Sequence, residues 1–153
     1  MMLGFKGLKA ESIENLEASL KSPISACYRQ FEYLKHSKQL SLFDQQTLQL
    51  YSQRDFPSVE IGPFLMCLTE LLEKHHGQKV WVLIDEYDTP LQYAYLNGFF
   101  PEAVALLKQV LGAVLKSNTA LYKAVITGIT RISKESLFSD LNNISVYDIS
   151  EDF

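Results

Sequence analysis

The sequence predicts an α/β fold, a short parallel sheet of three strands with helices on its faces. Apolar segments of strand length alternate along the chain with longer amphipathic segments that have helical spacing. One strand segment, residues 80–84, is continuously apolar, which is typical of a central parallel strand with both faces covered. With 153 residues, of which 47% are apolar, the chain is large enough for one globular domain.

The first third of the chain predicts a strand followed by helices. Residues 1–7 form a short apolar run that ends at a glycine, and we expect the first strand there. Ser12 can cap a helix that continues to about Leu20. Pro23 predicts a break or kink before a second helical segment at 24–34, because proline lacks the amide that a helix interior needs.

The next segment predicts two more helices. Ser41 and Asp44 have the S-x-x-D spacing that can satisfy the first-turn amides of a helix. Residues 53–62 have prolines nearby and are interpreted as a connector. Apolar side chains recur on one helical face of residues 64–76, and Gly77 suits the left-handed C-cap that ends such a helix.

The second half of the chain predicts a strand, a helix and a strand. Residues 80–84 form the second strand, and residues 97–98 mark a turn after it. Pro101 can open a helix with an apolar stripe. Residues 124–127 predict a third strand that ends at Gly128. The apolar stripe of the helix that Pro101 opens consists of Val104, Leu107, Leu111, Val114 and Leu115.

The charge and the cysteine content limit the classes of function that the chain can have. The net charge is −4 and the basic residues are scattered, so nucleic acid and anionic membranes are not indicated, although a local basic cluster stays open. Cys27 and Cys67 match no metal-binding spacing, which favours reduced thiols. The sequence has no apolar run of roughly 18 to 20 residues and no secretory signal, so we expect a cytoplasmic protein without a membrane span.

Three carboxylates, Asp85, Glu86 and Asp88, directly follow the apolar strand 80–84. Ligands of open α/β sheets bind outside the carboxyl ends of the strands. An apolar strand followed by Asp-Glu is the pattern of phosphate-binding ATPases, in which the Asp helps hold Mg²⁺ and the Glu accepts a proton from water. The bare motif leaves a second interpretation open, in which Asp85 caps the following segment while Glu86 and Asp88 are solvated.

Longer segments carry a resemblance to a known family. LIDEYDTPLQYAYLNGFFPEAVALLKQVLGAVLKSN, followed by KAVITGITRISKESLFSDLNNISVYDIS, resembles the AAA-ATPase-like family of bacterial P-loop proteins, which often carry a C-terminal nuclease-like domain. MLGFKGLKAES resembles the strand and helix that follow the P-loop in that family, and YLKHSKQLSLFDQQ resembles its helical insert. The resemblance covers most of the chain and implies a partial P-loop NTPase-like three-layer fold.

The resemblance implies roles for individual residues. Asp85 matches the magnesium-associated carboxylate of the Walker B motif, and Glu86 matches the catalytic base. Thr127 occupies the sensor position that reads the γ-phosphate or orients water. Arg131 and Lys134 follow in the family's motif, and the resemblance implies that they contact phosphate or a partner, Arg131 at the catalytic site and Lys134 with the nucleotide.

The chain departs from the family at the phosphate cradle. It contains no G-x-x-x-x-G-K-[ST], whose amides, lysine and hydroxyl hold the phosphates and the metal. Residues 1–153 are therefore expected to form one partial domain that lacks the N-terminal P-loop strand and helix and any C-terminal domain. Mg²⁺ and ATP are implied by the resemblance, but we expect no tight binding by the isolated chain. Asp88, Asn142 and Asn143 belong to the motif without an assigned role.

Two hypotheses follow. In the first, the chain carries the Walker B and sensor part of an ATPase and hydrolyses ATP only with a separately encoded P-loop segment. In the second, it is a non-catalytic remnant or a protein-interaction module. The resemblance also implies a strand order in which strand 80–84 is central and 124–127 forms an apolar edge, and such an edge predicts self-association.

Overall fold

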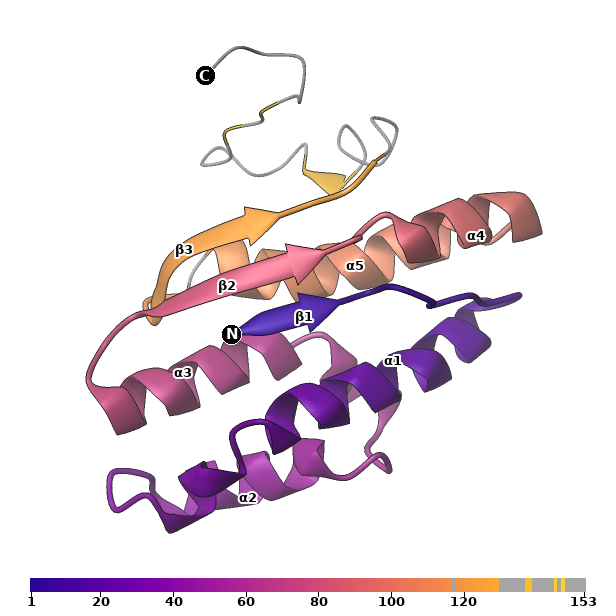
Figure 1. The fold of residues 1–153 in the computed structure, drawn as a ribbon. Coiled ribbons are helices and arrows are strands. Elements are labelled where there is room, and N and C mark those ends of the chain that lie inside the picture. Colours follow the sequence, from indigo (N-terminus) through magenta and orange to yellow (C-terminus); the bar gives the residue numbers. More distant parts are fainter. Residues whose placement is uncertain (117, 130–136, 139–144, 146, 148–153) are drawn as a thin grey trace.

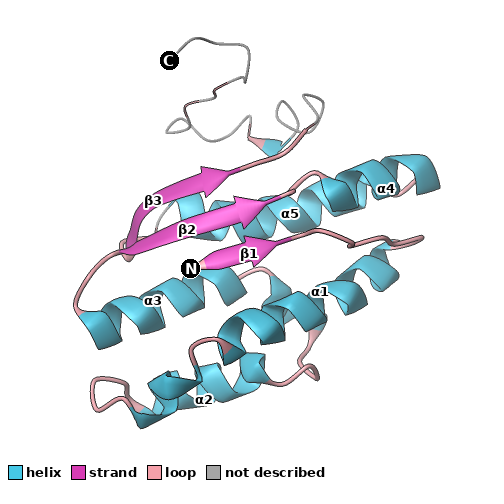
Figure 2. Cartoon of the chain, viewed as in Figure 1, coloured by secondary structure: helices cyan, strands magenta, loops and turns pink. Residues whose placement is uncertain are grey.

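A computed structural model gives the fold of residues 1–116, 118–129, 137–138, 145 and 147 (Figures 1 and 2). Helices and strands alternate in it, as the sequence predicts. In chain order the elements are β1 (Met2–Gly4), α1 (Ile13–Arg29), the 3₁₀ helix η1 (Glu32–His36), α2 (Leu42–Ser52), the 3₁₀ helix η2 (Ser58–Ile61), α3 (Phe64–His76), β2 (Val80–Asp85), α4 (Thr89–Asn97), α5 (Phe100–Lys116) and β3 (Leu121–Ile126).

The three strands form one parallel sheet in the order β1-β2-β3. Met2 of β1 lies beside Leu83 of β2, and Leu83 lies beside Val125 of β3. The predicted fold class is confirmed, as is the central position of the continuously apolar strand. The outer side of β3 has no neighbouring strand among the described residues.

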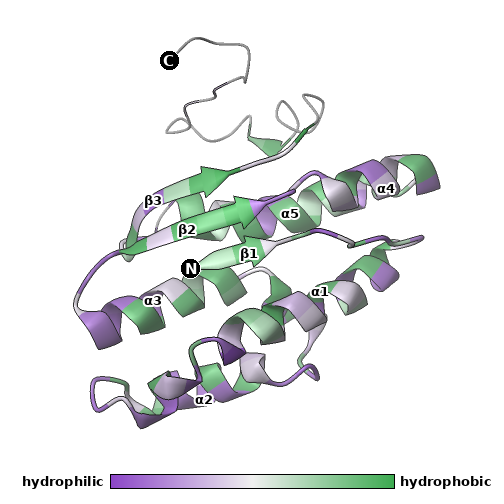
Figure 3. Cartoon of the chain, viewed as in Figure 1, coloured by the Kyte–Doolittle hydropathy of each residue, from purple (hydrophilic) through white to green (hydrophobic). Residues whose placement is uncertain are grey.

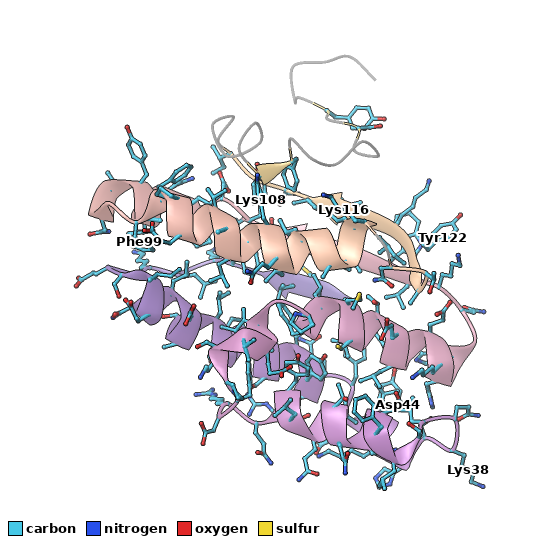
Figure 4. The ribbon with its side chains drawn as sticks, turned by 180° about the vertical axis from the view of Figure 1, so that it is seen from behind. Lys38, Asp44, Phe99, Lys108, Lys116 and Tyr122 are labelled. Atoms are coloured by element: carbon cyan, nitrogen blue, oxygen red, sulfur yellow. The ribbon has the colours of Figure 1, made fainter. Side chains whose placement is uncertain are left out.

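The helices that contact the strands lie on one side of the sheet. In Figure 1 the strands stand in front of α3 and α5, and Figure 4, drawn from behind, shows the helices in front of the strands. α1 contacts β1, α3 contacts β2 and α5 contacts β3, while α2 packs on α1 and α3. The chain makes two crossover connections, from β1 to β2 and from β2 to β3, and both step across the sheet in the same direction. Because parallel crossovers are almost always right-handed, both connections place their helices on the same face.

The two faces of the sheet therefore differ in burial. On the helical face Leu3, Val82 and Ile84 are at most 3% exposed. The opposite face, which we call the open face, is also apolar but lies in solvent (Figure 3). The expectation that both faces of strand 80–84 are covered is wrong for the described residues. The large apolar side chains of the open face are those of Met2 (56% exposed), Trp81 (47%), Leu83 (40%), Tyr122 (58%) and Val125 (47%), and the register also places Lys123 on this face, with its ammonium group over the Trp81 ring.

The predicted helix ends are largely confirmed. The Ser12 hydroxyl accepts a hydrogen bond from the Asn15 amide at the start of α1. Ser41 and Asp44 form a complete capping box at the start of α2. Gly77 ends α3 with a φ of 65°, in the left-handed region that glycine adopts without strain.

Pro23 does not divide the first helix, so the predicted break and the separate second helix are wrong. α1 continues through Pro23 as one helix of 17 residues, and the segment 24–34 is not a separate helix. Leu16, Leu20 and Ile24 keep helical spacing across the proline and are buried in the core. Their burial outweighs the cost of the proline, whose missing amide hydrogen bond and ring clash together amount to about 3 kcal/mol.

Several element boundaries also differ from the prediction. β1 is shorter than the apolar run 1–7, and β3 begins three residues before the predicted start at Ala124. η2 lies within the connector 53–62, and α4 was not predicted. None of the helices in the described part of the chain is long and apolar enough to cross a membrane.

Candidate functional site

The candidate site lies at the carboxyl ends of β2 and β3, where a row of three residues crosses the sheet on its open face. The row consists of Gly4, Asp85 and Thr127. Gly4 of β1 pairs with Asp85 of β2, and Thr127 directly follows β3, the neighbour of β2 on its other side. A Cβ atom at Gly4 would meet none of the described residues within 4 Å. Asp85 therefore has free space on one side and a hydroxyl on the other.

Asp85, Glu86 and Thr127 form one hydrogen-bonded group. The Thr127 hydroxyl donates a short hydrogen bond to the Asp85 carboxylate and accepts one from the Glu86 amide at 3.4 Å. The backbone joins the same residues, because the Thr127 amide donates to the Ile84 carbonyl at 2.8 Å and the Tyr87 amide donates to the Thr127 carbonyl at 3.2 Å. The structure thus brings together three of the residues that the sequence singled out.

Glu86 has a left-handed backbone conformation. Its φ is 53°, and it is the one residue other than glycine with positive φ in the described part of the chain. This region is unfavourable for a residue with a Cβ atom, and at a functional site such strain is kept only where surrounding contacts hold it. At Glu86 these contacts include the bonds that its amide and the Tyr87 amide make to Thr127, and the bond that its carbonyl accepts from the Thr89 amide at 3.1 Å.

Asp88 is buried and bonded across the two strand ends. It is 1% exposed, and its carboxylate accepts hydrogen bonds from the Ile129 amide at 2.8 Å and from the Gln92 side chain at 3.1 Å. The alternative in which Asp88 is solvated is therefore wrong. The bonding partner of Asp85 is Thr127, and the α4 N-cap position belongs to Asp88, so Asp85 does not have the capping role of that alternative.

Tyr87 and Gly128 pack closely beside this carboxylate. A Cβ atom at Gly128 would lie 2.8 Å from the Tyr87 ring atom Cδ1 and 2.9 Å from Asp88 Oδ1, so only glycine fits without displacement. The Tyr87 hydroxyl is buried and has no hydrogen-bond partner among the described residues. Burial, with a smaller contribution from the Asp88 carboxylate, raises the pKa of Tyr87 to about 12.

The donor atoms suit one part of a nucleotide–metal site. Mg²⁺ prefers oxygen ligands and is usually bound by one or two carboxylates together with phosphate oxygens, and Asp85 and Thr127 offer a carboxylate and a hydroxyl side by side. No group of three or more His, Cys, Asp or Glu side chains among the described residues could hold a metal ion unaided. Arg131 and Lys134 lie outside the described residues, as do Asn142 and Asn143.

Sequence reasoning missed three contributors to this site. Gly4 lies beside Asp85 only through the strand register, and the bond from Ile129 to Asp88 joins residues 41 positions apart. The close approach at Gly128 depends on the position of the Tyr87 ring. The carboxylate of Asp88 within the motif was a signal, but nothing local indicated its partner.

The fold is that of an α/β protein with carboxylates at the ends of its parallel strands, and comparison with known families gives its class. The model of the family described as Predicted AAA-ATPase matches residues 1–138. The chain belongs to this AAA-ATPase-like family.

A relative is found in Azotobacter chroococcum mcd 1, where it is described as an uncharacterized protein in the vnfD 5′ region. It is 34% identical over 91 residues, which are 54% of this chain and 16% of that protein. The chain thus matches a small part of the relative's length. No solved structure matches the chain significantly.

Proposed function

We propose that the chain carries the catalytic carboxylates of an ATP-hydrolysing site and acts only when a P-loop segment from outside these 153 residues supplies the phosphate cradle. The observation that carries the proposal is the group of Asp85, Glu86 and Thr127, bonded together at the carboxyl ends of two neighbouring parallel strands. This is where nucleotides bind in open α/β sheets. Membership of the AAA-ATPase-like family supports the same reaction class.

The shape of the sheet supports the need for a further segment. A P-loop is built as a strand, a glycine-rich loop and a helix. β3 has an outer side without a neighbouring strand among the described residues, and the open face beside it is apolar. A strand added to β3 and a helix laid over the open face would bring phosphate-binding amides to the end of the sheet where Asp85 lies.

Each residue of the group has a separate proposed role. Asp85, with Thr127 beside it, would help hold Mg²⁺, which supplies positive charge to the phosphate oxygens when it is bound. Glu86 would accept a proton from the attacking water. Thr127 would sense the γ-phosphate or orient the water. Arg131 and Lys134 are proposed to contact phosphate or a partner.

The test begins with calorimetric titration of ATP–Mg²⁺ into the isolated chain. We expect no micromolar binding, because carboxylates without the cradle repel a polyanion. The product of a neighbouring reading frame with G-x-x-x-x-G-K-[ST] is then added. We expect nucleotide binding, ATP hydrolysis and a blue shift of the emission of Trp81, the single tryptophan of the chain. Micromolar binding by the isolated chain would contradict the proposal.

Glu86→Gln in the complemented protein tests the proposed base. We expect hydrolysis to fall by roughly 10²- to 10⁴-fold with nucleotide affinity unchanged, because the amide keeps the shape of the side chain but cannot accept the proton. Glu102→Gln, at an exposed position on α5, is the matched control and should keep full turnover. Equal turnover by Glu86→Gln would remove Glu86 from this role.

The open face favours a second candidate function, a protein-interaction module without catalysis. Five large apolar side chains on one side of a parallel sheet form a surface suited to a protein partner. The two functions differ in a single readout. A partner that shifts the Trp81 emission without producing ATP turnover favours the interaction module.

A further inference from the structure

Asp88 occupies the N-cap position of α4, but its side chain does not cap that helix. An aspartate at this position ordinarily accepts a hydrogen bond from an amide in the first helical turn. Here the carboxylate accepts from the Ile129 amide at 2.8 Å, two residues beyond Thr127. The group best placed to cap α4 is thus used to bind the segment that follows β3.

Among the described residues, this bond belongs to a series of three that joins the ends of β2 and β3. Moving outward from the sheet, Ile84 accepts from the Thr127 amide, Thr127 accepts from the Tyr87 amide, and Asp88 accepts from the Ile129 amide. Each bond involves a residue farther along the chain from β2 or β3 than the one before it. The segment 127–129 is therefore held from both ends, by the strand ladder on one side and by Asp88 on the other.

We propose that Asp88 is a positioning residue, whose bond to the Ile129 amide holds Thr127 against Asp85 and keeps Glu86 in its left-handed conformation. The inference rests on the proposed function only for the importance of the three residues it positions. The positioning itself is a property of the chain without nucleotide.

The physical basis is that hydrogen bonds to neighbouring residues hold Glu86 in a backbone conformation, with positive φ, that is unfavourable by itself. The Glu86 and Tyr87 amides donate to Thr127, while the Glu86 carbonyl accepts from the Thr89 amide at the start of α4. If segment 127–129 moves away, the two bonds to Thr127 are lost and we expect Glu86 to relax to an ordinary negative φ. Burial strengthens the restraint, because a carboxylate that is 1% exposed has little water to replace the Ile129 amide.

Gly128 makes the close approach possible. The Cβ atom of any other residue would lie within 3 Å of the Tyr87 ring and the Asp88 carboxylate, so it would push segment 127–129 away from Asp88. Gly128→Ala should therefore weaken the same bond as a substitution of Asp88, but from the opposite side. This gives a second, independent variant for the test.

The experiment uses nuclear magnetic resonance of the isolated chain, without nucleotide or partner. The signature of the positive φ is a strong NOE between the amide and α protons of Glu86, and the strength of the Ile129 bond is read from amide exchange. In the unaltered chain we expect both the NOE and a protected Ile129 amide. In Asp88→Ala we expect the NOE to weaken to an ordinary intensity and Ile129 to exchange roughly tenfold to hundredfold faster.

Two further variants separate positioning from general stability. Asp88→Asn keeps an oxygen that accepts from the Ile129 amide, and we expect it to retain the NOE and the protection. Ser25→Ala removes a buried hydroxyl that donates to the Gln53 carbonyl in a distant part of the core. It should lower global stability while leaving the Glu86 signature unchanged.

An unchanged Glu86 NOE and unchanged Ile129 exchange in folded Asp88→Ala or Gly128→Ala would overturn the proposal. If neither variant folds, the unaltered chain still decides it, because an Ile129 amide exchanging at the rate of a free peptide is incompatible with the bond. Failure of nucleotide binding in the complementation test leaves these measurements unaffected. The two proposals can therefore fail separately.

Discussion

The two faces of the sheet have similar side chains and opposite environments. On the helical face Val82 and Ile84 are at most 1% exposed beneath α3 and α5, whereas on the open face Trp81 and Leu83 of the same strand are 47% and 40% exposed. A sheet designed to face water on one side alternates apolar and polar residues, and β2 does not alternate. The strand has the composition of a sheet covered on both sides.

The composition of a strand and its burial in the structure therefore carry different information. The composition of β2 reflects the environment for which the strand is suited, while its exposure reflects only the described residues. Both crossovers step in one direction, and right-handedness then assigns their helices to a single face. A cover for the open face must therefore come from a segment other than these two connections.

The largest expected difference between the faces is in stability. Ile84→Ala removes a side chain that is 1% exposed and should lower the free energy of unfolding by about 2–5 kcal/mol. Leu83→Ala, one position earlier on the open face, should cost less than about 1 kcal/mol because the side chain is already partly hydrated. Urea unfolding measures both. Equal losses would show that the open face is buried in solution.

The second expected difference is in association. We predict that the purified chain self-associates through the outer edge of β3 and the open face beside it. Val125→Lys places a charge on both surfaces and should weaken association by roughly tenfold, as followed by light scattering over a concentration series.

Leu96→Lys is the matched control for association, because Leu96 is an equally apolar and more exposed residue on α4, away from the sheet edge. It should leave association unchanged. A sharp monomer peak for the unaltered chain, with protected amides at Val125 and Ile126, would instead mean that the edge is covered within these 153 residues.

The smallest expected effect is a loss of stability among the helices behind the sheet, where the Asp44 carboxylate is paired with Lys74. Asp44, at the start of α2 in Figure 4, is 6% exposed and accepts a hydrogen bond from Lys74 at 2.5 Å. Burial alone would raise the pKa of Asp44, but the bonds from Lys74 and Ser41 outweigh it, so the pKa lies below the ordinary value of 3.8. Asp44→Asn should cost about 1 kcal/mol at neutral pH.

The pH dependence of this effect has a defined sign. A carboxylate with a lowered pKa in the folded state contributes stability that is present above its unfolded value and lost as the pH falls through the folded value. The difference between the unaltered chain and Asp44→Asn should therefore persist above about pH 4 and shrink at lower pH. Exposed Asp55, changed to Asn, serves as the control, and a difference independent of pH would contradict the assignment.

The successful sequence predictions depended on local patterns. The glycine C-cap at Gly77 and the capping box at Ser41 each occupy a few consecutive residues, and the structure confirms both. The strand order that the family resemblance implied is confirmed as well, and in the structure this order brings Thr127 beside Asp85.

The features that escaped prediction depend on residues distant in sequence. Pro23 sits inside a helix because the surrounding core holds it there. The exposure of Leu83 follows from the handedness of two connections, which no local pattern contains. The bond between Asp88 and Ile129 needs the final positions of both strands.

In the left-handed conformation of Glu86, the Cβ atom of the side chain crowds the backbone of the same residue. Glycine would adopt a φ of 53° without steric penalty, so the glutamate is retained at the expense of folding stability, on the order of 1 kcal/mol. Selection for stability alone would favour glycine there. Under the proposed function, the carboxylate of Glu86 is the reason for a glutamate at this position, and glycine at the same position in a related chain would mark the loss of the proposed base.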